Sequence, residues 1–237
     1  MVLAGVDGCK YGWVLVKFDG VKYSYGGIYK EFQSLIDENP EISKILIDIP
    51  IGLSSSNKLR TLDKALRNKI SRRSSSVFNA PCRKALLANN YHEAKEINKT
   101  IEGKGLSKQT YFIQQKIHEV DCFLQANRNW LDYLLESHPE FCFFCLSGGK
   151  YLDKKSTAFG VEQRKRILQK HIIEMDDVLH DALNNTLRKE LKIDDVLDAM
   201  CLCLINQLGA TDKLSFINDP LGFDEFGIPM KIAYYKC

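Results

Sequence analysis

The amino-acid sequence predicts an α/β fold in which a mixed β-sheet carries helices on both faces. Residues 3–25 contain three β-rich runs separated by glycine turns, a pattern typical of an antiparallel meander. Residues 45–51 are rich in isoleucine and leucine (Ile45, Leu46, Ile47, Ile49 and Ile51), as in a strand buried on both faces. Helical patterns cover most of the remaining chain, and strands that alternate with helices indicate a sheet covered on both sides.

The first predicted strand ends at Asp7. Gly8 and Gly12 follow it and allow the backbone to turn back with positive φ. A second turn at Asp19-Gly20 continues the meander, because Asp-Gly between β-rich runs is a hairpin signal. Asp7 has two interpretations at this point: a turn residue whose carboxylate accepts backbone N–H groups, or an acid placed at a strand end for chemistry.

The fourth predicted strand also ends at an acid. Pro50 cannot donate a hydrogen bond to a central ladder, so regular pairing is expected to stop near Asp48. A fifth strand is expected at 131–138, and after residue 209 the tail is expected to be irregular, with one further strand considered at 230–235. The residues between the fourth and fifth strands read as helical. We therefore expect a single domain, 1–237, with a helical insertion at about 54–130.

The last strong helical segment, 194–208, carries two acids on one face. Asp195 and Asp198 are three residues apart, and the helix is apolar nearly all round beyond Asp198. An acid near a helix N-terminus is favourable, which is the alternative interpretation of Asp195 and explains Asp198 less well. An unpaired carboxylate on a buried helix is costly, so Asp198 needs a partner: a metal, a lysine or arginine, or water in a cleft.

Composition is that of an ordinary globular protein of 237 residues, 45% hydrophobic and 27% charged. No apolar run approaches the roughly 20 residues that span a bilayer, and the start lacks a signal-peptide pattern, so we expect a cytoplasmic protein without a membrane partner. The eight cysteines are expected to be buried thiols. Residues 58–84 contain nine basic side chains against Asp63 alone, which suits either a phosphate backbone or a solvated helix face.

If the acids of the two strand ends and the last helix meet, they need a cation. Carboxylates brought together repel one another, and hard oxygen ligands favour Mg²⁺ or Mn²⁺. Two such ions about 4 Å apart can activate water and stabilise the leaving oxygen in phosphodiester hydrolysis. The candidate metal ligands and catalytic acids are Asp7, Asp48, Asp195 and Asp198.

This arrangement of acids resembles the ribonuclease H-like superfamily, and within it most nearly the Holliday-junction resolvases. More specifically, the chain resembles the family called domain of unknown function 429, described as predicted nucleases. Tyr11, Ser54 and Asn79 depart from the usual family pattern in loops and remove no candidate acid. The matching words are Val6-Asp-Gly-Cys-Lys10, Ile47-Asp-Ile-Pro-Ile-Gly-Leu53, Arg73-Ser-Ser-Ser-Val-Phe78, Gly103-Lys-Gly-Leu-Ser107, Lys116-Ile-His-Glu-Val-Asp121, His138-Pro-Glu140 and Asp194-Asp-Val-Leu-Asp-Ala199.

The resemblance implies a ribonuclease H-like mixed sheet of five strands and a metal site made by the four aspartates. It also makes Glu136 a catalytic candidate that could add a fifth oxygen, with a salt bridge or a rim position as the alternative. His138 could contact a substrate phosphate or merely finish a strand. The substrate-binding candidates are Lys10, Arg73, Ser75, Ser76, Lys104, Lys116 and His138.

The function that follows is a divalent-metal-dependent nuclease or phosphodiesterase, with Mg²⁺ or Mn²⁺ as cofactor and a nucleic-acid phosphate backbone as partner. Two alternatives stay open. One is a phosphotransferase or hydrolase that acts on a small phosphorylated metabolite. The other is a non-catalytic nucleic-acid-binding or scaffold module that has kept the fold, since a fold does not fix a function.

Overall fold

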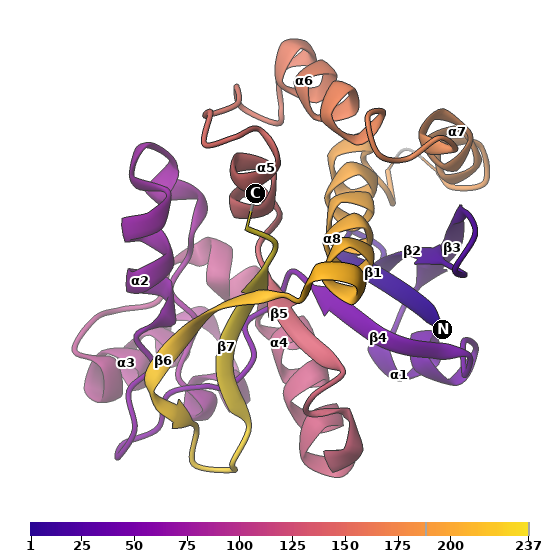
Figure 1. The fold of residues 1–237 in the computed structure, drawn as a ribbon. Helices are drawn as coiled ribbons and strands as arrows, with labels where there is room; N and C mark the ends of the chain where they lie inside the picture. Colours follow the sequence, from indigo (N-terminus) through magenta and orange to yellow (C-terminus); the bar gives the residue numbers. More distant parts are fainter. Residues whose placement is uncertain (188, 237) are drawn as a thin grey trace. The chain divides into compact units, whose positions relative to one another are not determined.

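The computed structural model describes residues 1–187 and 189–236 (Figure 1). The chain forms two compact units. Unit 1 comprises Met1–Ile49, Tyr133–Ser215 and the described residues from Ala233 on, and unit 2 comprises Pro50–Asp132 and Phe216–Ile232. Unit 2 thus contains the residues expected as a helical insertion, together with a C-terminal segment that the sequence did not assign to it. The expectation of one domain stays a prediction.

The described residues form strands, α-helices and short 3₁₀ segments. The strands are β1 (Val2–Gly8), β2 (Trp13–Phe18), β3 (Tyr23–Tyr29), β4 (Ile42–Ile47), β5 (Leu134–Ser137), β6 (Ser215–Phe223) and β7 (Pro229–Tyr234). The α-helices are α1 (Phe32–Asp37), α2 (Leu62–Lys69), α3 (Tyr91–Glu102), α4 (Lys108–Ala126), α5 (Pro139–Leu146), α6 (Ala158–Leu168), α7 (Met175–Asn184) and α8 (Ile193–Asp212). Short 3₁₀ segments are η1 (Ser71–Ser76), η2 (Arg83–Leu87) and η3 (Arg128–Trp130).

The strands form a mixed sheet in the order β3-β2-β1-β4-β5-β7-β6. β1, β2 and β3 form the antiparallel meander, whereas β4 pairs parallel with both β1 and β5. The predicted mixed α/β class is confirmed, but the predicted number of five strands is wrong, because the sheet has seven. Pro220 and Gly222 lie inside β6 and break the apolar alternation that marks a strand, so the sequence pattern there resembles an irregular tail.

Local signals account for several element boundaries. β4 ends at Ile47, just before the proline that was expected to stop it. The Ser107 side chain caps α4 by accepting a hydrogen bond from the Thr110 backbone N–H. Helix α2 begins at Leu62, well after the end of β4. The preceding backbone is held instead by side chains, since Ser54 Oγ accepts from the Arg60 N–H at 2.8 Å.

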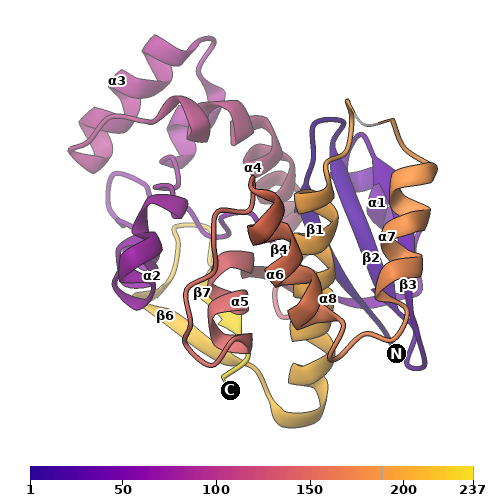
Figure 2. The same cartoon turned by 90° about the horizontal axis from the view of Figure 1, so that it is seen from above.

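Helices cover both faces of the meander in unit 1. α7 and α8 lie on one face, and α1 lies on the other (Figure 2). Phe32 of α1 packs edge-on against Trp13 of β2, with ring centroids 5.5 Å apart. On the α8 side, the Asn206 side-chain amide donates to the carbonyls of Ala4 at 3.0 Å and Lys44 at 2.9 Å. This buried amide fixes α8 to β1 and β4 at once.

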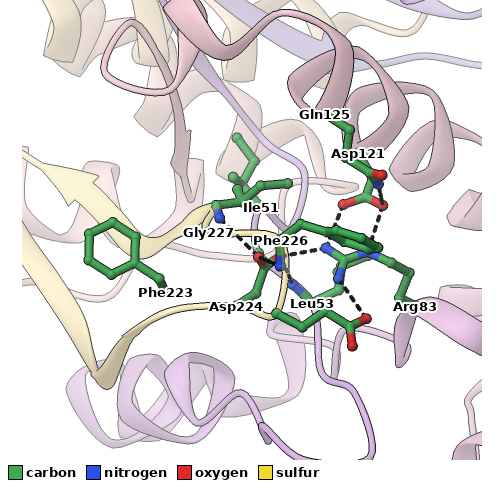
Figure 3. A network of polar contacts seen from close by, with 12 residues as sticks. Ile51, Leu53, Arg83, Asp121, Gln125, Phe223, Asp224, Phe226 and Gly227 are labelled. Atoms are coloured by element: carbon green, nitrogen blue, oxygen red, sulfur yellow. Dashed lines mark hydrogen bonds and ion pairs between the residues drawn. The ribbon is translucent and has the colours of Figure 1, made fainter.

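A buried ion network joins distant segments inside unit 2 (Figure 3). The Arg83 guanidinium donates to both carboxylate oxygens of Asp121, at 2.8 and 2.9 Å, and also to Asp224. The other oxygen of Asp224 accepts from the Ile228 N–H at 2.9 Å, and the Leu53 N–H donates to the carboxylate at 3.2 Å. Charge-assisted bonds of this kind are about twice as strong as neutral ones. The network therefore connects the start of unit 2 to η2, α4 and the β6–β7 turn.

Candidate functional site

Asp7 and Asp48 lie at the same edge of the sheet in unit 1. Asp7 is the penultimate residue of β1, and Asp48 directly follows the parallel neighbour β4. The Asp48 backbone N–H donates to the Val6 carbonyl at 3.1 Å, which extends the pairing of the two strands by one residue. Asp7 Oδ1 accepts from the Gly8 N–H at 2.8 Å, so the turn interaction expected of Asp7 is present as well.

Helix α8 brings a third acid to this edge. A β-carbon built on Gly5 would lie 2.1 Å from the Ala199 carbonyl oxygen, so the α8 backbone rests directly on β1. Gly5 and Asp7 are two residues apart and point to the same face of the strand. Asp198 immediately precedes Ala199 and is only 3% exposed. The close approach at Gly5 therefore positions the Asp198 carboxylate on the side of the sheet to which Asp7 points.

Asp195 has a structural role at the start of α8. Its Oδ2 accepts from the Lys192 backbone N–H at 3.0 Å, which satisfies a backbone donor at the start of the helix. The carboxylate is partly buried, and burial, first of all, raises its pKa to about 6. Asp194 and Asp198 raise the pKa of Asp195 further, while Lys192 and Lys155 lower it. Asp195 is thus both a helix cap and a member of the acid group.

Lys155 supplies the positive charge of the group. Its Nζ donates to Asp198 Oδ2 at 2.6 Å and lies 3.7 Å from Asp194 Oδ2. The residue belongs to the connector between α5 and α6, just before Thr157, which caps α6. Burial would lower the pKa of the Lys155 ammonium, but the carboxylates of Asp198, Asp7 and Asp48 outweigh this effect and raise it.

Burial raises the pKa values of the remaining aspartates, and neighbouring carboxylates raise those of Asp7 and Asp198 further. Burial raises the pKa of Asp7 well above its usual range, and the neighbouring carboxylates of Asp48 and Asp198 raise it further. Burial raises the pKa of Asp48 to about 6 against the opposing charge of Lys155. The pKa of Asp198 is raised by burial and by Asp48, although Lys155 pulls it down. One ammonium therefore does not offset the cost of ionising the whole acid group.

Glu136 lies on β5, the strand next to β4, and His138 and Glu140 follow it at the start of α5. Glu136 is 7% exposed and stands opposite Ile47 of β4, the residue before Asp48. His138 caps α5, because its Nδ1 accepts from the Phe141 N–H at 3.3 Å. Glu140 pairs with the fully buried Arg164 at 2.5 Å. The family motif His138-Pro-Glu140 thus starts helix α5 and provides the ion-pair partner of the buried Arg164.

The other predicted phosphate ligands are distributed over both units. Lys10 is exposed in the turn between β1 and β2 of unit 1. Arg73 belongs to unit 2, where its carbonyl accepts from Ser76 Oγ at 2.7 Å and closes a 3₁₀ turn. Lys104 Nζ lies 3.6 Å from Glu102, so it is paired rather than isolated. Ser75 and Lys116 also belong to unit 2.

The sequence model of a family described as "Protein of unknown function (DUF429)" matches residues 5–221. The chain belongs to this family. All four aspartates, Glu136 and Lys155 lie inside the matched DUF429 region. No curated protein and no solved structure matches the chain.

The acid group of this DUF429 chain supplies the kind of ligand atom, carboxylate oxygen, that a hard divalent cation prefers. Every candidate ligand is a carboxylate, and repulsion among carboxylates is what a bound cation relieves. Over residues 1–187 and 189–236, no three His, Cys, Asp or Glu side chains are grouped as a metal site. Lys155 holds one oxygen of Asp198 at 2.6 Å instead. The donors are therefore gathered around an internal ammonium.

Sequence reasoning missed two cations of the DUF429 site. It offered a metal, a lysine or arginine, or water as the partner of Asp198 and did not name Lys155, which is 43 residues away along the chain. Arg164 was also missed, because a single arginine in an amphipathic segment reads as solvated. In fact it donates to the Asp153 and Gly160 carbonyls and lies over the Phe143 ring, 5.4 Å from the centroid. The available signal was the basic connector ahead of α6.

Proposed function

We propose that this DUF429 protein is a divalent-metal-dependent phosphodiesterase of the nuclease class. The observation that carries the proposal is the gathering of Asp7, Asp48 and Asp198 from two strand ends and a helix. Burial and the neighbouring carboxylates raise the pKa of Asp7. Such a cluster is unfavourable without a bound cation, because its ionised carboxylates repel one another. Carboxyl groups with strongly shifted pKa values are typical of functional sites. A divalent cation would relieve the repulsion and make the ionised forms favourable.

The strand order and the positions of the acids support a ribonuclease H-like architecture. In the order β3-β2-β1-β4-β5, three antiparallel strands are followed by two strands parallel to β1. The acids occur at the ends of β1 and β4 and on the helix that crosses them. This is the placement that the resemblance implied for a nuclease of that superfamily. We therefore propose that this part of the sheet has the ribonuclease H-like topology.

Asp7, Asp48 and Asp198 would hold the cation, with Asp195 and Glu136 as further oxygen donors. A bound Mg²⁺ or Mn²⁺ supplies Lewis-acid polarisation of the phosphodiester and acidifies water. The chain's own contribution is to hold these carboxylates in place, through the packing of α8 on β1 and the hydrogen bond that Asp195 accepts at the start of α8. Arg73, Ser75, Ser76, Lys104 and Lys116, with Lys10 and His138, are proposed to contact substrate phosphates.

A cleavage assay tests the proposal. Labelled single-stranded, duplex and branched oligonucleotides of DNA and RNA are incubated with the protein and Mn²⁺ or Mg²⁺. We expect Asp7→Asn and Asp198→Asn to reduce cleavage by at least 100-fold. Asp177→Asn serves as the matched control, because Asp177 is an exposed acid in the first turn of α7.

The outcomes separate the alternatives. Cleavage that survives both substitutions would overturn the assignment of the site. Hydrolysis of bis(p-nitrophenyl) phosphate without oligonucleotide cleavage would favour a small phosphorylated substrate. Oligonucleotide binding with no hydrolysis under any metal would favour the non-catalytic module.

A further inference from the structure

We propose that Lys155 is an internal counter-ion, whose ammonium occupies the cation position beside Asp198 and leaves it when a divalent cation binds. The inference rests on the proposed function in one respect, namely that the aspartates bind a divalent cation. It adds a competitor that the acid cluster carries within the same chain. Metal affinity would then be set by a lysine as well as by the carboxylates.

The charges around the ammonium support this role. Asp198 accepts from Nζ at 2.6 Å, and Asp194 lies at 3.7 Å. Asp7 and Asp48 also attract the same ammonium. The neighbouring cation Arg164 is committed to Glu140 at 2.5 Å and to two backbone carbonyls. Lys155 is therefore the cation that directly bridges members of the acid group.

The backbone around Lys155 is fixed. The Asp153 N–H donates to Gln163 Oε1 at 2.7 Å, and its carbonyl accepts from Arg164 at 3.0 Å. The Lys154 carbonyl accepts from Thr157 Oγ1 at 2.8 Å. A β-carbon on Gly160 would lie 2.1 Å from the Lys154 carbonyl oxygen, so α6 rests on this peptide. Displacement of the ammonium therefore requires rotation of the Lys155 side chain and no movement of the connector.

The Lys155 side chain can also move into solvent. The Lys155 side chain is 44% exposed, whereas that of Asp198 is 4% exposed. The flexible four-carbon stem can carry the ammonium into water while the carboxylate stays buried. A divalent cation must break the Lys155–Asp198 pair and also approaches a positive charge. Removal of that charge should therefore strengthen cation binding.

Calorimetric titration with Mn²⁺ at pH 7.5 tests the inference on the full chain. We expect Lys155→Met to bind Mn²⁺ at least tenfold more tightly than the wild type, and Lys155→Gln to show a gain in the same direction. Lys154→Met is the matched control, since it removes an equal charge from an exposed neighbour. Circular dichroism checks that each variant is folded, and Lys155→Gln keeps the test valid if Lys155→Met does not fold.

A second readout follows the lysine itself in the wild-type protein. Acetylation by an amine-reactive reagent, measured by mass spectrometry, should increase at Lys155 on addition of Mn²⁺ and stay constant at Lys154. Equal or weaker Mn²⁺ binding in both Lys155 variants would overturn the counter-ion role and leave the metal site standing. Failure of the wild type and every variant to bind Mn²⁺ would instead overturn the proposed function, and this inference with it.

Discussion

Gly5 of β1 and Ala199 of α8 approach so closely that a β-carbon on residue 5 would lie 2.1 Å from the Ala199 carbonyl oxygen. The same β-carbon would lie 2.2 Å from the Cys203 backbone nitrogen, one helical turn further on. A helix can rest on a strand at this distance only where the strand residue has no side chain. The contact lies two residues before Asp7 and one residue after Asp198, so it sets the spacing of the candidate site.

Gly5→Ala should destabilise the protein by more than about 2 kcal/mol, because overpacking against backbone atoms forces the helix to shift. Urea unfolding followed by circular dichroism measures the loss. Gly105→Ala is the control, since its β-carbon would meet only the flexible Lys95 side chain, at 3.1 Å. Equal effects of the two substitutions would contradict the packing argument.

Ionisation of Asp48 should weaken the fold in the absence of metal. Its pKa is about 6 in the folded protein, above the ordinary value of 3.8. A raised carboxyl pKa contributes stability that is complete below about pH 4 and is lost as the pH rises through about 6. Asp48→Asn removes this titration and should gain on the order of 2 kcal/mol over the wild type at pH 7.

The measurement is urea unfolding between pH 4 and pH 7.5 in the presence of a chelator. The difference between Asp48→Asn and the wild type should grow with pH across that window. Asp177→Asn, at an exposed position, should leave the profile of the wild type unchanged. A constant difference between Asp48→Asn and the wild type at all pH values would rule out this titration.

Arg83→Ala should cost about 3–5 kcal/mol, because it leaves the carboxylates of Asp121 and Asp224 buried without their cation. Arg83→Lys should recover only part of the loss, since an ammonium cannot reproduce the two bonds to Asp121. The control is Arg166→Ala, which removes an exposed pair with Glu162 worth about 0.5 kcal/mol or less. Thermal unfolding compares the three variants, and similar losses for Arg83→Ala and Arg166→Ala would exclude a structural network.

Arg73→Ala should weaken oligonucleotide binding if Arg73 contacts a phosphate. The plot of log affinity against log salt concentration should then become shallower by about one unit. Fluorescence anisotropy across a salt series measures both quantities. Lys170→Ala, which removes an exposed charge from unit 1, should leave the slope unaltered. An unchanged slope in Arg73→Ala would remove Arg73 from the proposed interface.

Local signals predicted those parts of the fold that neighbouring residues determine. The Asp-Gly turns predicted the meander, and Pro50 marked the end of β4. The interpretation of Asp198 as a buried acid in need of a partner also came from its apolar surroundings on one helix.

Pairings between distant residues left no such signal. Lys155 and Asp198 are 43 residues apart, and Arg83 and Asp224 are 141 apart, so only the folded chain identifies them as partners. The strand β6 escaped prediction because Pro220 and Gly222 carry turn chemistry within it. Its place is set by non-local bonds such as Asp219 Oδ2, which accepts from both the N–H and the hydroxyl of Thr61.

The discontinuity of unit 2 imposes an order on folding during synthesis. Residues 50–132 leave the ribosome long before Asp219 and Asp224. Asp219 accepts a hydrogen bond from the Thr61 N–H, and Asp224 pairs with the Arg83 guanidinium. Until then the emerging segment carries unsatisfied backbone groups and an incompletely neutralised guanidinium. Such partly finished intermediates are prone to aggregate and are clients of chaperones. The C-terminal segment 216–232 therefore completes unit 2 only at the end of synthesis. A nascent chain that stalls before residue 216 should be a target for cellular quality control.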